Sequence, residues 1–557
     1  MRRSQTMSHQ QSFGSPRNDN ALTAPATRET ETKKGRFNAH GMWWLVCVAL
    51  ITALLCAPFF RVVYGMADEG AILRGAELML RGKKLYADFF EFLPPATYLL
   101  TTAWFALAGL SIASARTLAI LTVVGIACFT FLSSRQASKD APLSAVLVCS
   151  WAMMSQWQWL QVSHHWFTTF FSMLAAWAAL ASLGQSQPRS SLWPVVAGLA
   201  SGAAITTMQT CGLWVALATI IAFRTRSELL AYVLGLALIP AIVILYLVEQ
   251  NTLAAAFDDV VIFAATQYAS IQSVPFGYGT STLDYPISYL FPLVAFLAIF
   301  IGISDWRTHL REHRFQLCIA LALAGLVGCF PRPDVVHIGF GAPLALPLLA
   351  YCAGPLVRRL SPPYRRAAIA ATVVFYLPPV VAYVNLSNNA FHARAVPTPR
   401  GDTIFASNQD MSKIIGRIAA IPPGESFFFY PFMPLLPFLT AREHVSKYDL
   451  FVPWYTTPAQ YQSACQSLVR EATWVVLDRR FRDNSYWKGA YPAIPDAEPR
   501  ETIQFEKALK SAFAPVVTEG DFDLRRRRPG ISDDLCHGIN PPEDTQQLGA
   551  RHSSKDQ

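Results

Sequence analysis

Residues 42–80 read MWWLVCVALITALLCAPFFRVVYGMADEGAILRGAELML. The stretch begins with an apolar run over 42–60 and continues, a few residues later, with the acidic pair Asp68-Glu69. A helix that crosses a membrane needs about 20 mostly apolar residues, so 42–60 is predicted to span a membrane. Carboxylates directly outside such a helix are costly unless they have partners or a function. The stretch therefore predicts a membrane protein with an acidic loop after its first span.

The composition of the whole chain extends this prediction. Of the 557 residues, 52% are apolar and only 15% are charged, whereas about 25% of an ordinary soluble protein is charged. The mean hydropathy is +0.29. These values exclude a disordered chain, a fibrous repeat and a set of soluble domains. They leave a multi-span α-helical membrane protein, for which the lipid bilayer is the first partner.

The net charge of +9 does not predict a nucleic-acid partner. The basic residues of the apolar part form short clusters between hydrophobic runs, where positive charge orients helices toward the cytoplasm. We read 94–113 as a re-entrant or surface-lying helix, because one more span would place Arg135 and Lys139 outside. About eleven spans remain, predicted at 42–60, 116–134, 143–161, 166–184, 192–208, 211–223, 229–249, 286–304, 315–331, 338–356 and 367–386.

These spans give a domain plan and a location in the inner membrane. The N-terminus is expected in the cytoplasm, and an odd number of spans puts the C-terminal region in the periplasm. The predicted parts are a disordered cytoplasmic tail (1–41), a transmembrane domain (42–386) whose first periplasmic loop is 61–94, a linker (387–400), a periplasmic α/β domain (401–530) and a disordered tail (531–557).

The C-terminal domain is predicted from a change in composition after residue 386. Residues 427–430 and 474–478 are apolar runs typical of buried strands, and 405–420 is typical of a helix. Cys465 and Cys536 lie in this polar part and could pair if it is extracytoplasmic. The sequence leaves that pairing open.

The first loop also carries a family resemblance. Its elements are Asp68-Glu69 after the first span, the pattern Gly-x-x-Leu-Tyr-x-Asp-Phe-Phe over 82–90, the pair Pro94-Pro95, and Arg116 at the opening of the next span. Together they resemble the GT-C fold glycosyltransferases, and are similar to bacterial aminoarabinose and lipopolysaccharide-core sugar transferases and to protein O-mannosyltransferases. The resemblance implies transfer of a sugar from a polyprenyl-phosphate donor to a lipid, glycan or protein acceptor on the periplasmic side.

The resemblance gives roles to the acidic pair. Asp68 corresponds to the carboxylate that acts as base or positions the acceptor, and Glu69 is expected to support it. A base must lie within hydrogen-bond reach of the attacking hydroxyl. The alternative for Asp68 is structural, because it falls at the start of an amphipathic helix, where it could act as an N-cap.

The second periplasmic loop departs from the family pattern. Relatives often carry an acid there, but this chain has His164 and His165. The pair could bind a phosphate or share the role of base, or it could cap the following helix. The change also puts in doubt a metal site built from the carboxylates of two loops. No metal ligands are assigned, and the need for a divalent cation or any other cofactor stays unknown.

Two further stretches concern the donor phosphate. Gly198-x-x-x-Gly202 is typical of close helix packing, and after it the family's Lys is replaced by Met208, which leaves Gln209 as an uncharged donor. Either the phosphate contact lies elsewhere in this chain, or this member uses a different donor. The candidates for the contact are Arg332, Asp334 and His337, which resemble an Arg…His element before a late span. Arg332 suits bidentate phosphate binding. The alternative is an Arg–Asp pair that satisfies only itself.

Two other functions are weighed against the glycosyltransferase. A transporter or flippase of a lipid-linked sugar would need ionisable residues near the middle of spans and internal repeats, and the sequence shows neither. A catalytically inactive GT-C scaffold would explain the missing Lys and the His substitution. The 250–285 loop could fold over the donor lipid or the acceptor, but the favoured interpretation is a plain surface loop.

Overall fold

The structure is a computed structural model that describes residues 28–157, 159–184, 192–304, 309, 311–405, 410–482 and 484–539. The chain divides into two units after Trp43. The description below concerns the second unit, from Trp44 onward. Most of the predicted tails 1–41 and 531–557 lies outside the described residues. At their inner ends the structure differs from the prediction, because helix α1 already begins at Arg28 and the described chain continues to Ile539.

Each predicted span overlaps a helix. These helices are α1 (Arg28–Cys56), α4 (Ile112–Ser138), α5 (Ala141–Ser155), α6 (His164–Leu183), α7 (Leu192–Thr207), α8 (Gln209–Thr219), α9 (Arg226–Glu249), α13 (Leu290–Ser304), α15 (His313–Val327), α16 (Val335–Arg359) and α17 (Pro362–His392). Within the described ranges, 6 helices are long and apolar enough to cross a membrane. Six shorter apolar helices accompany them, and the number of spans stays a prediction.

Helix α16 lies at the centre of the bundle and carries the candidate site at its N-terminus. It packs against α4, α5, α6 and α15, and nearly all of its residues from Val335 to Gly354 are buried. The predicted close packing at Gly198 is confirmed, since a Cβ atom there would overlap the carbonyl oxygen of Tyr232 in α9. Tight packing of this kind holds the helix ends in fixed positions.

The first loop folds over one end of the bundle. It contains β1 (Val62–Val63), α2 (Asp68–Leu80) and α3 (Ala96–Ala108). Helix α3 falls in the range predicted to be re-entrant or surface-lying, and its 13 residues are fewer than the roughly 20 that a span requires. Strand β1 pairs in parallel with β2 (Ile404–Phe405), which lies after α17. The first loop is therefore joined directly to the C-terminal part of the chain.

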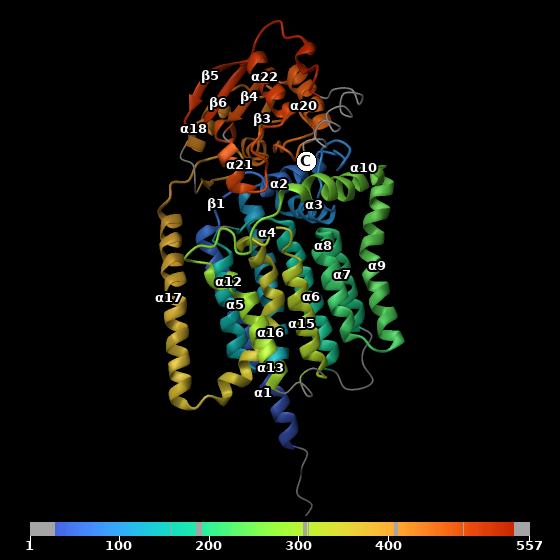
Figure 1. Ribbon diagram of the computed structural model, residues 1–557, viewed down its shortest axis with the longest axis vertical. Coiled ribbons are helices and arrows are strands. Elements are labelled where there is room, and N and C mark those ends of the chain that lie inside the picture. The colour runs from blue at the N-terminus through green and yellow to red at the C-terminus, as the bar shows by residue number, and fades with distance from the viewer. Residues whose placement is uncertain are drawn as a thin grey trace, which may run out of the picture. The chain divides into compact units, whose positions relative to one another are not determined.

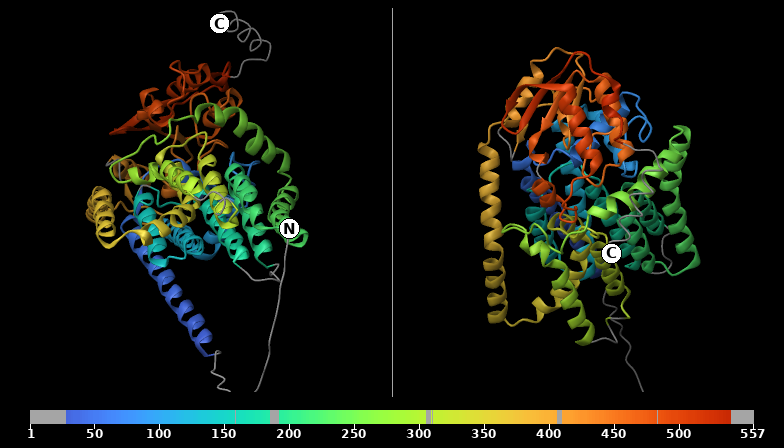
Figure 2. Two further views of the ribbon diagram at one scale, coloured as in Figure 1. Left: turned by 60° about the horizontal axis from the view of Figure 1, so that its bottom comes forward. Right: turned by 45° about the horizontal axis from the view of Figure 1, so that its top comes forward.

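The C-terminal α/β region, residues 404–539, lies beyond the end of the bundle that carries α2 and α3 (Figure 1). Both views in Figure 2 keep its sheet on that side. The sheet order is β3-β4-β6-β5, with β3 and β4 parallel and the other pairs antiparallel. Its strands are β3 (Phe427–Tyr430), β4 (Trp474–Asp478), β5 (Phe513–Glu519) and β6 (Phe522–Arg527).

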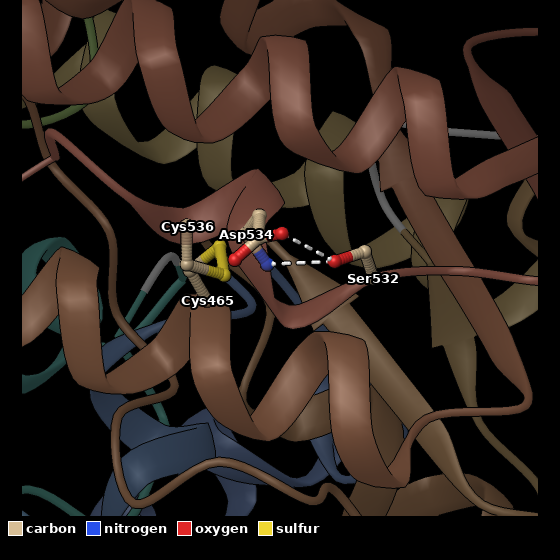
Figure 3. Close-up of a disulfide and its surroundings, with 4 residues drawn as sticks. All are labelled: Cys465, Ser532, Asp534 and Cys536. Carbon is tan, nitrogen blue, oxygen red and sulfur yellow. Dashed lines mark hydrogen bonds between the residues drawn. A yellow bond between two sulfur atoms is a disulfide. The ribbon is translucent and has the colours of Figure 1, made fainter.

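The two strands expected from the sequence, 427–430 and 474–478, coincide with β3 and β4. The helices of the region are α18 (Asp410–Ala419), α19 (Leu435–Thr440), α20 (Pro458–Glu471), α21 (Asn484–Ala490) and α22 (Arg500–Ala512). Cys465 of α20 and Cys536 form a disulfide (Figure 3). Because Cys536 is buried against this core, the α/β region extends beyond the expected boundary at 530.

The 250–285 segment differs from the surface loop expected. It contains α10 (Leu253–Phe257), the π-helix η3 (Asp258–Tyr268) and α11 (Ala269–Ile271), and ends at α12 (Tyr285–Ser288). Its apolar side chains Phe263 and Ile271 are buried with residues of the C-terminal α/β region. The sequence missed this packing because the partners are nearly 200 residues away in the chain.

Candidate functional site

Asp68 stands at the first turn of α2 without a protein partner. The N-cap of α2 is Ala67, and no side chain caps this helix end. Within the part of the chain that the structure describes, the Asp68 carboxylate makes no hydrogen bond and no ion pair, and the side chain is exposed. The structure therefore does not show the capping role that the sequence left open, and the carboxylate is free to meet a ligand.

Glu69, the next residue, has a different environment. Its side chain and that of Arg116 are each 1% exposed and form an ion pair. Arg116 Nη2 donates to Glu69 Oε2 at 2.9 Å and to the Val62 carbonyl oxygen at 2.9 Å. The backbone N–H of Val162 donates to Glu69 Oε1 at 3.1 Å. Glu69 and Arg116 thus connect the start of α2 with β1, α4 and the second loop, directly next to Asp68.

Arg332, Asp334 and His337 form one hydrogen-bonded group at the N-terminus of α16. Asp334 is the N-cap, and its Oδ1 accepts from the backbone N–H of His337 at 2.9 Å. The His337 Nδ1 lies 2.7 Å from the same oxygen. Arg332 Nε donates to Asp334 Oδ2 at 2.8 Å. The Arg–Asp pair named as the alternative is therefore present, but it uses only the Nε–H group of Arg332.

The remaining contacts of Arg332 reach other parts of the chain. Its Nη1 donates to Gln272 Oε1 at 3.3 Å, and its Nη2 donates to the carbonyl oxygen of Ala490 at 2.7 Å. A guanidinium has five N–H groups, of which the structure uses one each at Nε, Nη1 and Nη2. Two N–H groups remain for a ligand.

The structure brings Asp68 to this group. The Asp68 carboxylate interacts electrostatically with His337, Arg332 and Asp334. Although the Asp68 side chain is accessible to solvent, the protein atoms around it desolvate the carboxylate and raise its pKa, and the charges of His337 and Arg332 only partly oppose that effect. For Asp334, burial also disfavours the charged form, but the hydrogen bonds from His337 and the charge of Arg332 outweigh it and lower the pKa. The pKa of Asp68 is thus raised while that of Asp334 is lowered. A pair of carboxylates with separated pKa values is common in acid–base sites.

The histidine pair lies beside His337. The ring of His165 stacks on Phe340 at 4.4 Å between centroids and meets the ring of His337 edge-on at 4.8 Å. His164 contacts His165 at 3.9 Å, and its Nδ1 is buried without a hydrogen-bond partner in the described chain. Ser163, not a histidine, is the N-cap of α6, so the capping alternative does not hold for the pair.

Gln209 is the predicted residue that the structure places apart. Its Nε2 donates to the carbonyl oxygen of Val260 in η3 at 3.2 Å. Among the described residues no contact links its side chain to Arg332 or His337. The neighbouring Met208, which replaces the family's Lys, lines a small cavity together with His165 and His337. The Gln209 side chain therefore connects the start of α8 with η3 through this hydrogen bond.

Three tyrosines that the sequence did not assign surround Asp68. Tyr268 ends η3, while Tyr455 and Tyr491 come from the C-terminal α/β region, and each interacts electrostatically with Asp68. The guanidinium carbon of Arg332 lies 5.3 Å from the centre of the Tyr491 ring. No sequence signal connects the two distal tyrosines with the first loop, because their proximity arises only in the folded chain.

Two acids, Glu91 and Asp449, interact electrostatically where the first loop meets the C-terminal α/β region. Glu91 is 3% exposed, and burial together with the charge of Asp449 raises its pKa well above the ordinary value. Burial also raises the pKa of Asp449 to about 6, although Arg74 acts in the opposite direction. Next to them, the backbone N–H of Phe90 donates to the Lys447 carbonyl oxygen at 3.0 Å.

The acids, histidines and cysteines do not gather into a metal site in the ranges described. Groups of three or more such side chains placed to hold a metal ion are absent there.

Comparisons with known proteins place this site in a known fold. Neither the protein-family models nor the curated proteins give a match to the sequence. The crystal structure of ArnT from Cupriavidus metallidurans bound to undecaprenyl phosphate matches with a TM-score of 0.52 and 14% identity, over 89% of this chain and 98% of that chain. Its apo state matches with the same score and identity over 91% and 99%. Arabinofuranosyltransferase AftD from Mycobacteria has a TM-score of 0.47 and 14% identity, over 88% and 40%. The chain has the GT-C fold, a multi-pass membrane fold.

Proposed function

We propose that this protein is a membrane glycosyltransferase that moves a sugar from a polyprenyl-phosphate donor to a lipid, glycan or protein acceptor. The observation that carries the proposal is the unpaired carboxylate of Asp68 beside Arg332 and His337, at one mouth of a GT-C bundle. The undecaprenyl phosphate bound to ArnT supports the class of donor.

Asp68 is proposed to act as the base. The acceptor hydroxyl gives its proton to the Asp68 carboxylate while its oxygen attacks the anomeric carbon of the donor sugar. The bond between that carbon and the phosphate oxygen breaks, and the polyprenyl phosphate leaves with the electron pair. A carboxylate with a raised pKa is a stronger base, and general bases of this kind contribute about 10²–10⁴-fold to a rate.

Arg332 and His337 are proposed to meet the departing phosphate. The two unused N–H groups of Arg332 suit the oxygens of a phosphate, and fixed donors at the point where charge develops stabilise the transition state. Asp334 orients both side chains through its two carboxylate oxygens. His164 and His165 would line the site beside His337. The buried Nδ1 of His164, which has no hydrogen-bond partner in the described chain, would be a further polar atom available to the phosphate.

The arrangement in the membrane is part of the proposal. About eleven helices would cross the inner membrane, with the N-terminus in the cytoplasm. The first loop 61–94 and the C-terminal α/β domain would then lie together in the periplasm, joined by the 387–400 linker. The pairing of β1 with β2 supports a common side for these two parts.

Binding of undecaprenyl phosphate to the full-length protein in nanodiscs tests the proposal. We expect saturable binding of undecaprenyl phosphate but not of the uncharged undecaprenol, and at least tenfold weaker binding after Arg332→Gln, since charge-assisted hydrogen bonds contribute about 1.5–3 kcal/mol. Arg365→Gln on the exposed face of α17 is the matched control and should bind like the wild type. Equal affinity for both lipids would contradict the proposal.

A flippase would produce a different result in cells. A transferase moves labelled sugar from the lipid carrier to another molecule, whereas a flippase leaves the label on the carrier and changes only its leaflet. An inactive scaffold would do neither. Following the labelled sugar in cells with and without the protein separates the three functions.

A further inference from the structure

The tyrosines around Asp68 come from two distant parts of the chain. Tyr268 closes the π-helix η3, and Tyr455 and Tyr491 belong to the C-terminal α/β region. Tyr491 directly follows α21, which lies at the junction between the sheet and the bundle (Figure 1). The C-terminal α/β region therefore contributes side chains to the space around Asp68.

Their rings are held in place by neighbouring aromatic side chains. The centroids of Tyr268 and Tyr455 are 6.0 Å apart, and Phe92 of the first loop contacts both, at 4.8 Å and 5.8 Å. Phe263 adds a contact of 5.0 Å to Tyr455. Aromatic contacts of this kind fix ring positions, so the hydroxyl groups point in set directions.

Tyr491 is held by the arginine of the site. The Arg332 guanidinium carbon lies 5.3 Å from the ring centre of Tyr491, and the same arginine donates to the carbonyl oxygen of Ala490 at 2.7 Å. These two contacts dock the end of α21 on the N-terminus of α16. The position of Tyr491 thus depends on the group that faces the proposed donor phosphate.

The hydroxyl groups of the three tyrosines have no protein partner. In the ranges that the structure covers, none of the three hydroxyl groups makes a hydrogen bond. None of them is fully buried either, so each hydroxyl oxygen is accessible. This holds even for Tyr455, which is 5% exposed as a whole residue. Tyr268 and Tyr491 are half-buried and Tyr455 is buried, and their hydroxyl groups are left available to a polar ligand beside the Asp68 carboxylate.

We propose that Tyr268, Tyr455 and Tyr491 form a subsite for a neutral sugar ring of the acceptor. The inference rests on the proposed function, because it places the attacking hydroxyl of that sugar at Asp68. Phenol groups both donate and accept hydrogen bonds, as sugar hydroxyls do. The α/β region supplies two of the three, which favours an acceptor reaching the site from the side away from the bundle.

The charges of the site select against an anionic ligand at this position. Asp68 interacts electrostatically with all three tyrosines and Asp334 with Tyr268, and the positive charge of Arg332 is shared between Asp334 and, in the proposed function, the donor phosphate. A second anion would meet uncompensated negative charge in a partly desolvated space, which is unfavourable. A neutral pyranoside avoids this cost and matches the three hydroxyls.

Saturation-transfer NMR on the full-length protein in nanodiscs tests the subsite, with methyl α-D-glucoside, galactoside and mannoside as probes. We expect saturable binding of at least one of them, and weaker binding of the corresponding anionic uronide. Tyr455→Phe and Tyr491→Phe should each weaken binding about three- to tenfold, the usual range for one lost hydrogen bond. Tyr486→Phe, whose side chain in α21 is 42% exposed, is the matched control and should bind like the wild type.

Three results would overturn the inference: no binding of any glycoside, unchanged binding in both site variants, or displacement of the glycoside by citronellyl phosphoryl-glucose, a short donor mimic. Displacement would assign the tyrosines to the donor sugar. Melting temperatures confirm that the variants fold. Binding of undecaprenyl phosphate is measured on the same samples. If the wild type does not bind this lipid, the proposed function fails. If it binds the lipid but no glycoside, only the subsite fails.

Discussion

Glu69 and Arg116 form an ion pair in which each side chain is only 1% exposed, one residue away from the unpaired carboxylate of Asp68. Consecutive acids therefore have separate tasks. Glu69 fixes the start of α2 to α4 and to the second loop, and Asp68 is held at the surface of the site as a result.

Breaking this pair should destabilise the protein strongly. Arg116→Met leaves the Glu69 carboxylate buried without its partner, for which a loss of about 3–5 kcal/mol is expected. Thermal unfolding in detergent measures the change. Arg81→Ala is the control, since Arg81 is 46% exposed and its buried partner Glu77 keeps its ion pairs with Arg74 and Arg400, so a loss of about 0–1 kcal/mol is expected. Equal melting temperatures for Arg116→Met and the wild type would contradict this role.

The acid pair between the first loop and the α/β region predicts a pH dependence of stability. The pKa of Asp449 is raised from 3.8 to about 6 in the folded protein, and that of Glu91 is raised as well. The folded chain therefore holds protons that the unfolded chain releases, so the free energy of unfolding falls as the pH rises from about 4 through about 6. We expect the melting temperature to fall over this interval.

Acid-to-amide variants isolate that contribution. Asp449→Asn removes one of the two interacting carboxylates, so the fall in melting temperature between pH 5 and pH 7.5 should become smaller. Asp402→Asn changes an exposed acid in the same way and should leave the pH dependence as it is. The interpretation is wrong if both variants follow the wild-type curve.

The disulfide between Cys465 and Cys536 should stabilise the α/β region. It joins residues 71 apart in sequence, and closing a loop of this length contributes about 4 kcal/mol in the chain-entropy account. Cys536→Ser should lower the melting temperature and leave Cys465, which is buried in the native fold, reactive toward a maleimide after unfolding without a reductant. Cys128→Ser is the control because Cys128 is a free thiol of α4. Labelling of both cysteines in the unfolded, unreduced wild type would show that the bond does not form in cells.

The contact between α7 and α9 gives a steric test of the bundle. Gly198→Leu should abolish accumulation of folded protein, because any side chain there meets the backbone of α9, and overpacking of a filled core is destabilising. Gly302→Leu in α13 adds the same atoms where no atom lies within 4 Å. Size-exclusion profiles of the two variants are compared. Similar monodisperse peaks would rule out tight α7–α9 packing.

Much of the fold was predictable from local patterns. Apolar runs locate a helix at every predicted span, and the runs 427–430 and 474–478 match β3 and β4, because burial in lipid or in a sheet core leaves a continuous signature in the sequence. The grouping of Arg332, Asp334 and His337 was also predictable, since they lie within one turn of a helix start. Local spacing is sufficient for features of this kind.

The rest of the site depends on contacts between distant segments. Neither the buried partner of Glu69 nor the approach of Tyr455 and Tyr491 to Asp68 can be read from spacing, because each requires the α/β region or α4 to be placed against the first loop. The same reason explains the 250–285 segment, whose apolar residues are covered by the α/β region. Gln209 was misjudged because a polar residue at a helix start can equally well fasten a neighbouring helix.

The role of Asp68 as the base is the central claim, and one measurement tests it most directly. Cells that contain the wild type, Asp68→Asn or the control Asp402→Asn at equal abundance are compared by mass spectrometry of their lipids and glycans. We predict that a sugar-bearing product made by the wild type and the control falls at least about 100-fold with Asp68→Asn, in line with the loss of a general base. An undiminished product with Asp68→Asn would contradict the account.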